Sequence, residues 1–164
     1  MAFGPGTINS VGGAVADLFA ADAHRSKAQG LRLEAGNYGR SSAFSEQSAQ
    51  FTETSTAIKQ AQLDRDIFKT LGGQAADVAG AGFAASGSAL DILRESAAQG
   101  ALTKAVGGLQ GLITEEGYEV QAKNYAEMGK AALLAADAED KAATGSEWAA
   151  GFKGVAAVAS IFFK

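Results

Sequence analysis

Two near-absences exclude more about this chain than any motif that it carries. It has no cysteine, so it forms neither disulfides nor thiolate metal sites. It has a single proline, Pro5, and no later position holds another. Because proline interrupts a helix interior at a cost of about 3 kcal/mol, its absence beside abundant alanine, glutamine, glutamate and lysine favours long helices.

An excess of positive charge and a long apolar run are also missing. The chain has 14 basic and 18 acidic residues, a net charge of −4, and its basic residues are scattered. A dedicated nucleic-acid-binding face would show a basic stripe, so we expect no sequence-specific nucleic-acid binding. No stretch of about 18 strongly apolar residues and no basic-then-apolar leader is visible, so neither a simple membrane anchor nor a secretory signal is expected.

Large apolar side chains are scarcer than the composition suggests. Hydrophobic residues make up 47% of the chain, but many of them are alanine. A buried alanine contributes far less than the ~1.5–3 kcal/mol of a buried leucine or phenylalanine. We therefore expect a thin core and a stability that depends on packing against other copies or other proteins.

The spacing of small residues predicts an all-α fold. Ala14, Ala21, Ala28 and Ala35 fall seven apart, which is typical of a helix in a coiled coil. Most of the 21 glycines gather at 4–13, 72–87, 100–117 and 145–154, and we interpret these clusters as joints. The expected architecture is one elongated hairpin domain, made of an apolar glycine-rich segment (1–13), a long helix (14–71), a Gly/Ala/Ser joint (72–101) with a short helix (89–98), a second long helix (102–144) and an apolar C-terminal helix (146–164).

The joint carries a capping signal. Ser88 follows Gly87 and precedes Asp91 by three residues, which predicts a capping box with Ser88 as the N-cap. Ser146 is the corresponding N-cap candidate for the C-terminal helix.

Two sets of residues are candidates for packing between chains. Phe44, Phe51 and Ile58 resume the seven-residue spacing with an offset of two, and with Phe68 they predict a face buried between helices, many from other chains. Gly107 and Gly111 form a GxxxG pair that permits close helix approach, although this spacing is common by chance.

The C-terminal stretch is the candidate docking element. Its stripe at helical spacing consists of Trp148, Phe152, Val155, Ala159 and Phe162. One interpretation is a helix packed on this chain or on a neighbour. The other is an amphipathic helix that enters a membrane interface, and the two are compatible if the protein changes state.

No catalytic, cofactor or metal site is predicted, and we expect no enzyme. His24 has no cysteine or second histidine beside it and reads as a solvated or interfacial side chain. Glu115, Glu116 and Glu119 read as a solvated helix face. The glycines at residues 79–88 match neither the GxGxxG pattern of dinucleotide-binding proteins nor the P-loop (Walker) pattern, and no lysine follows them.

One segment resembles a known family. The run Ala85-Ser86-Gly87-Ser88-Ala89-Leu90-Asp91-Ile92-Leu93, between a Gln/Ser-rich and an Ala/Glu/Lys-rich helix, resembles the small internal virion proteins of T7-like short-tailed bacteriophages. The shared residues are Gly87, Ser88, Leu90 and Asp91, whereas the apolar aromatic tail replaces the basic tail of that family.

The resemblance implies an ejection protein that leaves the capsid with the genome and oligomerises, with other virion proteins, into a conduit through the host envelope. The expected location is the virion, and then the envelope, with host lipid as a further partner. One alternative is a structural tail or portal-associated helical protein without membrane activity. Another is a secreted helical-hairpin translocator or effector, although its usual Trp-x-Gly turn is missing here.

Overall fold

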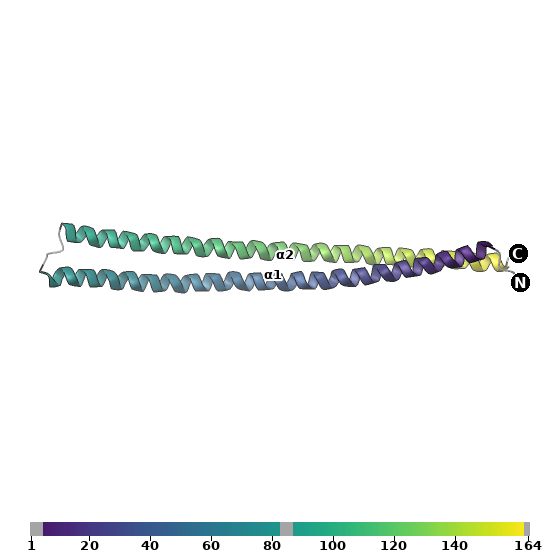
Figure 1. Ribbon diagram of the computed structural model, residues 1–164, viewed down its shortest axis with the longest axis horizontal. Helices are drawn as coiled ribbons and strands as arrows, with labels where there is room; N and C mark the ends of the chain where they lie inside the picture. Colours follow the sequence, from purple (N-terminus) through teal and green to yellow (C-terminus); the bar gives the residue numbers. More distant parts are fainter. Residues whose placement is uncertain (1–4, 83–86, 163–164) are drawn as a thin grey trace. The chain divides into compact units, whose positions relative to one another are not determined.

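The chain forms two long helices. The computed structural model describes the backbone of residues 5–82 and 87–162 and the side chains of residues 12–82 and 87–156. Helix α1 spans Pro5–Gly80 and helix α2 spans Ser88–Phe162 (Figure 1). Within those backbone ranges, only Ala81, Gly82 and Gly87 lie outside a helix, and no residue forms a strand. The predicted all-α class is therefore confirmed.

The helices are longer than the sequence predicted. Residues 5–13 and 72–80 belong to α1, and the predicted short helix, second long helix and C-terminal helix are all parts of α2. The predictions of a separate short helix at 89–98 and of a separate helix from 146 were therefore wrong. The Ser146 hydroxyl donates to the carbonyl of Ala142 at 3.1 Å, one turn back in the same helix, so Ser146 does not cap a new one.

Most glycines lie inside helices and do not act as joints. The described exceptions with positive φ are Gly82 (75°) and Gly87 (62°), which flank the connection between α1 and α2. Glycine weakens a helix interior by about 1 kcal/mol relative to alanine, but packing against a second helix overrides this preference. Several helical glycines of α2 do face α1 closely, as described below.

The start of α2 differs from the predicted capping box by one residue. The carbonyl of Gly87 accepts hydrogen bonds from the backbone N–H groups of Leu90 (3.1 Å) and Asp91 (3.3 Å). Gly87 therefore occupies the N-cap position, and Ser88 is the first helical residue. Asp91 lies in the first turn, where a negative charge favours the helix dipole.

The chain divides into two compact units. Unit 1 comprises Met1–Ser41 and Asn124–Lys164, and unit 2 comprises Ser42–Lys123. In unit 1, the first part of α1 lies antiparallel to the last part of α2. Unit 2 is a helical hairpin, in which the rest of α1 turns back into the start of α2 (Figure 1).

Alanine forms the core of unit 1. Each buried hydrophobic residue among the described side chains of the chain is an alanine, and no large side chain is fully buried. On α1 the buried positions of this unit are spaced by seven, as predicted, and α2 matches them with a second series that includes Gly129. The alanines are Ala21, Ala28 and Ala35 on α1 and Ala132, Ala136, Ala143 and Ala150 on α2. Small residues at this spacing let two helices approach closely.

Glycine takes over this role on α2 in unit 2. A Cβ atom on Gly111 would collide with the side chain of Thr56, and one on Gly100 would lie 2.9 Å from Cγ1 of Ile67. These facing residues are eleven apart on both helices, instead of seven. A seven-residue packing repeat favours a left-handed supercoil and an eleven-residue repeat a right-handed one, so the packing geometry changes along the sequence.

Candidate interaction surfaces

The large apolar side chains of the described chain lie mainly outside the contact between the helices. Phe44, Phe51, Ile58 and Phe68 are all exposed, at 55–80% of their surface. Most of the surface of each side chain lies outside the contact between the helices, and each of the first three comes two residues after a contact position. Two residues turn a helix by about 200°, so they point away from α2.

Phe44 and Phe51 border a groove in unit 2. Gln47, Ser48 and Thr52 of α1 and Tyr118 of α2 line the rest of it. The hydroxyls of Ser48 and Thr52 donate to the carbonyls of Phe44 and Ser48 on their own helix, at 2.9 and 2.8 Å. Because these two hydroxyls have partners within the helix, another chain can cover them without leaving them unpaired.

Helix α2 carries an outward apolar stripe in the same unit. Its residues are Leu102, Val106, Leu109, Ile113 and Val120, each exposed by 46–69% and each two positions after a residue that faces α1. Between residues 98 and 114 the one charged side chain is Lys104, which pairs with Asp64 of α1 at 2.8 Å. From Leu102 to Ile113 the stripe is therefore apolar and uncharged, over about three turns.

Gly107 and Gly111, predicted to be oligomer contacts, face α1 of the same chain. A Cβ atom on Gly107 would lie 3.9 Å from Cδ1 of Leu63, in ordinary contact, whereas Gly111 leaves no room for one. The close approach that the GxxxG spacing allows is thus used inside the hairpin of unit 2.

The tail stripe is exposed as far as its side chains are described. Trp148, Phe152 and Val155 expose 67–71% of their surface, and with Glu147 and Gly151 they line an open apolar groove on α2. The rings of Trp148 and Phe152 lie 6.2 Å apart in a tilted arrangement. Ala159 and Phe162 fall within α2, but their side chains lie outside the described residues.

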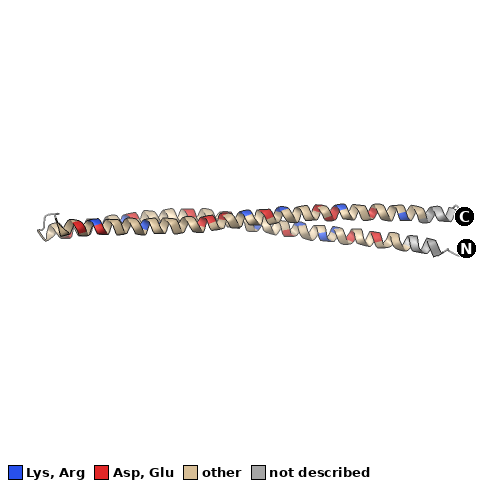
Figure 2. Ribbon diagram, turned by 90° about the horizontal axis from the view of Figure 1, so that it is seen from above, with Lys and Arg blue, Asp and Glu red and all other residues tan. Residues whose placement is uncertain are grey.

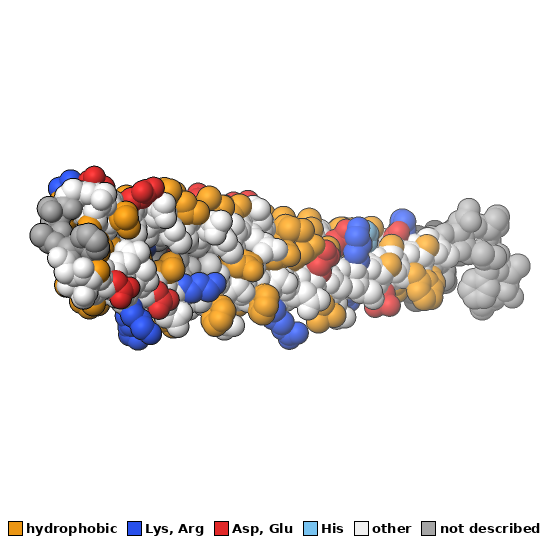
Figure 3. Space-filling view, turned by 60° about the vertical axis from the view of Figure 1, so that its left-hand side comes forward, with side chains coloured by type: hydrophobic (Ala, Val, Ile, Leu, Met, Phe, Trp, Pro, Cys, Tyr) orange, Lys and Arg blue, Asp and Glu red, His pale blue; other side chains and the backbone are white. Residues whose placement is uncertain are grey.

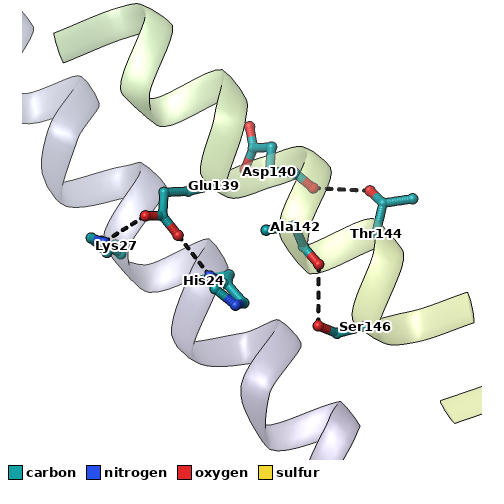
Figure 4. Close-up of polar contacts among 7 residues, drawn as sticks. All are labelled: His24, Lys27, Glu139, Asp140, Ala142, Thr144 and Ser146. Atoms are coloured by element: carbon teal, nitrogen blue, oxygen red, sulfur yellow. Dashed lines mark hydrogen bonds and ion pairs between the residues drawn. The ribbon is translucent and has the colours of Figure 1, made fainter. Parts of the chain in front are cut away.

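Ion pairs connect the two helices of unit 1. Glu139 of α2 accepts hydrogen bonds from Nδ1 of His24 (2.6 Å) and Nζ of Lys27 (2.5 Å), both on α1 (Figure 4). These two bonds lower the pKa of the Glu139 carboxyl. Further pairs join Arg25 to Glu147, Arg32 to Asp140 and Asp17 to Lys153, so most contribute a base from α1 and an acid from α2.

A stacked pair of tyrosines also marks the register of unit 1. The rings of Tyr38 and Tyr125 lie 6.4 Å apart at an interplanar angle of 24°. The Tyr38 hydroxyl donates to Glu34 at 3.0 Å, and this hydrogen bond raises the pKa of Tyr38. Gly129 of α2 lies close to Tyr38, since a Cβ atom on residue 129 would be 3.5 Å from Cβ of Tyr38.

Over the part of the chain that the structure describes, the surface has no large region of one charge. Acidic and basic residues are interspersed along both helices (Figure 2), and hydrophobic side chains reach the surface on the face shown in Figure 3. Among the described residues, no group of three or more acidic or histidine side chains is arranged to hold a metal ion. In that same part of the chain, no helix has the length and apolarity needed to cross a membrane.

Sequence reasoning missed the apolar stripe on α2 and the ion pairs of unit 1. The stripe could have been found by counting two residues on from each expected contact position. The ion pairs could not, since residues such as His24 and Glu139 are 115 positions apart. No known protein family, curated protein or solved structure matches this chain.

Proposed function

We propose that this chain is an internal virion protein of the ejection type, which oligomerises through its exposed apolar stripes as part of a conduit for phage genome delivery. The observation that carries the proposal is the partition of side chains. Alanine and glycine join α1 to α2, while phenylalanine, leucine, isoleucine and tryptophan remain on the outside. Exposed apolar surface of this extent marks an interaction site in a protein.

A thin core also suits passage through a narrow tail. The two helices of unit 1 are held by alanine contacts and by ion pairs at or near the surface, and each such pair is worth at most about 1 kcal/mol. Segments with few buried apolar contacts open at low free-energy cost. The chain can therefore separate its helices, move through a channel and pack again on the other side.

The polar face of α1 suits a water-filled interior. Residues 41–62 are rich in serine, threonine and glutamine, with few charges. Thr54 donates to the carbonyl of Gln50 at 2.9 Å and Ser55 to that of Thr52 at 3.0 Å, so these hydroxyls are bonded to their own helix. In an oligomer such a face would offer a hydrated lining with few charges past which a polyanion can move.

The groove at Trp148 is the proposed contact with host lipid after release. An apolar face with a tryptophan at its edge can bury itself in a membrane interface without spanning the bilayer. Other virion proteins would cover the same groove in the resting particle. The proposed activity involves binding and assembly without catalysis.

A structural role at the tail or portal is the second candidate. The observation that favours it is the groove at Phe44 and Phe51, which suits another helix and requires no lipid. A structural protein of this kind need not permeabilise vesicles, whereas an ejection protein should. Vesicle leakage therefore distinguishes the two candidates.

The experiment compares dye leakage from anionic vesicles with incorporation into particles. The wild type should release the dye, and Phe152→Asp should abolish release while the variant still enters particles. Leu33→Asp is the control, because Leu33 is equally exposed but lies on α1, away from the tail groove. If Phe152→Asp blocks entry into particles, the groove is an assembly contact. If the wild type releases no dye, the structural role is favoured.

A further inference from the structure

We infer that copies of this chain associate side by side through unit 2, with the outward stripe of α2 on one copy seated in the groove at Phe44 and Phe51 on the next copy. This inference rests on the proposed function in one respect, the oligomeric state. It adds the surfaces, the partner and the direction of the assembly.

The first argument is the match in repeat. On α1 the large side chains Phe44, Phe51 and Ile58 follow each other every seven residues. On α2 the same interval separates Val106, Ile113 and Val120. Seven residues advance a helix by about 10.5 Å, so projections on one surface can fit between projections on the other over their whole length.

The second argument is the match in level along the hairpin. Ser42 donates to the carbonyl of Ala122 at 2.9 Å, and Thr56 packs against Gly111. Because the helices are antiparallel, residues two positions after Ser42 and Thr56 lie level with residues two positions before Ala122 and Gly111. Phe44 is therefore level with Val120, and Ile58 is level with Leu109. The two surfaces are therefore at the same height on one hairpin, and a neighbour can dock without sliding along the helix axis.

The third argument is charge. The stripe on α2 has no charge between residues 98 and 114 apart from Lys104, which is paired with Asp64. Near the phenylalanines of α1, the acidic residues Glu46 and Glu53 come two positions after Phe44 and Phe51, on another side of the helix. The α2 surface from Leu102 to Ile113 and the α1 surface at Phe44 and Phe51 can therefore be buried without removing a charge from water, which would be costly.

The two surfaces are different, so the contact is head-to-tail. Such a contact generates a closed ring when successive copies are related by rotation, or an open filament when they also advance along an axis. Since the surfaces lie at the same level, the expected product is a ring.

Cysteine pairing between two variants tests this arrangement, because the natural chain has no cysteine. Tagged Phe51→Cys chains are mixed with untagged Ile113→Cys chains and oxidised. We expect a mixed disulfide dimer between tagged and untagged chains, at least about tenfold more abundant than the dimer of either variant alone. Leu33→Cys mixed with Ile113→Cys is the matched control and should give background levels.

A charge-swap series supplies the second measurement. Phe51→Lys and Ile113→Glu should each raise the dissociation constant by about tenfold or more, since both place a charge in an apolar contact. The double variant should recover association, because lysine on one copy then meets glutamate on the next.

The outcomes separate this inference from the proposed function. Sedimentation that shows oligomers, with no enrichment of the mixed disulfide and no recovery in the double variant, overturns the side-by-side contact and leaves the proposed function standing. A disulfide between two Phe51→Cys chains that is as abundant as the mixed one replaces the head-to-tail contact with a symmetric dimer. A wild type that stays monomeric at all concentrations contradicts both.

Discussion

Thr56 of α1 packs directly against the backbone of Gly111 of α2, so closely that a Cβ atom on residue 111 would overlap the threonine side chain. This contact shows how the hairpin of unit 2 is joined. One helix provides a medium-sized side chain and the other provides the space left by a glycine.

Gly111→Ala should destabilise the hairpin despite the better helix propensity of alanine. The new methyl collides with Thr56, whose Cβ would lie 2.9 Å away and cannot move independently of its backbone. The expected cost is about 1–3 kcal/mol, typical of overpacking. Gly117→Ala is the control, because nothing lies within 4 Å of that position, and it should stabilise the helix by up to about 1 kcal/mol. Urea unfolding followed by circular dichroism measures both, and equal effects would contradict the close contact.

Ser42→Ala should cost about 0.5–1.5 kcal/mol. The substitution removes the buried hydrogen bond from Ser42 Oγ to the carbonyl of Ala122 on the other helix. Thr54→Ala removes a hydrogen bond of the same length within one exposed helix and should change the free energy of unfolding by less than about 0.5 kcal/mol. A cost for Thr54→Ala that matches that of Ser42→Ala would argue against a special role for the interhelical bond.

Lowering the pH should reduce the stability of unit 1, because it protonates Glu139. Its pKa is lower in the folded chain than its ordinary value of 4.5, because Lys27 and His24 hydrogen-bond to the carboxylate. A lowered folded pKa gives a stabilisation that is complete above the unfolded value and is lost as the pH falls through the folded one. Glu139→Gln should therefore be less stable than the wild type at pH 7, and the difference should shrink below pH of about 4.5.

The measurement is the midpoint of thermal unfolding between pH 3 and pH 7. Glu127→Gln, at an exposed position on the same helix, is the control and should track the wild type. A difference between Glu139→Gln and the wild type that stays constant across the range would show that its ionisation is not coupled to folding.

The turn should depend on Gly87 more than on Ser88. Gly87 has a φ of 62°, where a side chain costs about 1–2 kcal/mol, so Gly87→Ala should destabilise the hairpin by that amount. Gly87→Asn should cost less, since asparagine tolerates this conformation. Ser88→Ala should cost less than the ~1 kcal/mol of a lost N-cap, because Ser88 is already inside the helix. A larger loss for Ser88→Ala than for Gly87→Ala would restore the predicted capping box.

Trp148 is the one tryptophan and reports on its groove. It is 67% exposed, so its fluorescence should be that of a hydrated indole and should be quenched readily by acrylamide. Anionic vesicles should shift the emission to shorter wavelength and protect it from the quencher, and Phe152→Asp should prevent both changes. Emission that is unaffected by vesicles would remove the lipid contact from the proposed function.

The amino-acid sequence by itself determined that the chain is helical and that alanine joins the helices. The lack of proline after Pro5 and the seven-residue spacing of Ala21, Ala28 and Ala35 are local properties, and both appear unchanged in the structure. The spacing of Phe44, Phe51 and Ile58 was equally visible, but spacing alone gives a common face and not the object that this face contacts.

Only the tertiary structure decided where the helices end and which glycines are tolerated inside them. A glycine cluster lowers helix stability locally, which is why the sequence predicted helix ends near Gly100 and Gly145. Packing against a second helix can outweigh this loss, because a glycine leaves space for a side chain of that helix. At Gly100 this space is occupied by Ile67. The pairing of His24 with Glu139 depends in the same way on antiparallel register, which is set by contacts over the whole length of unit 1 and which no short segment contains.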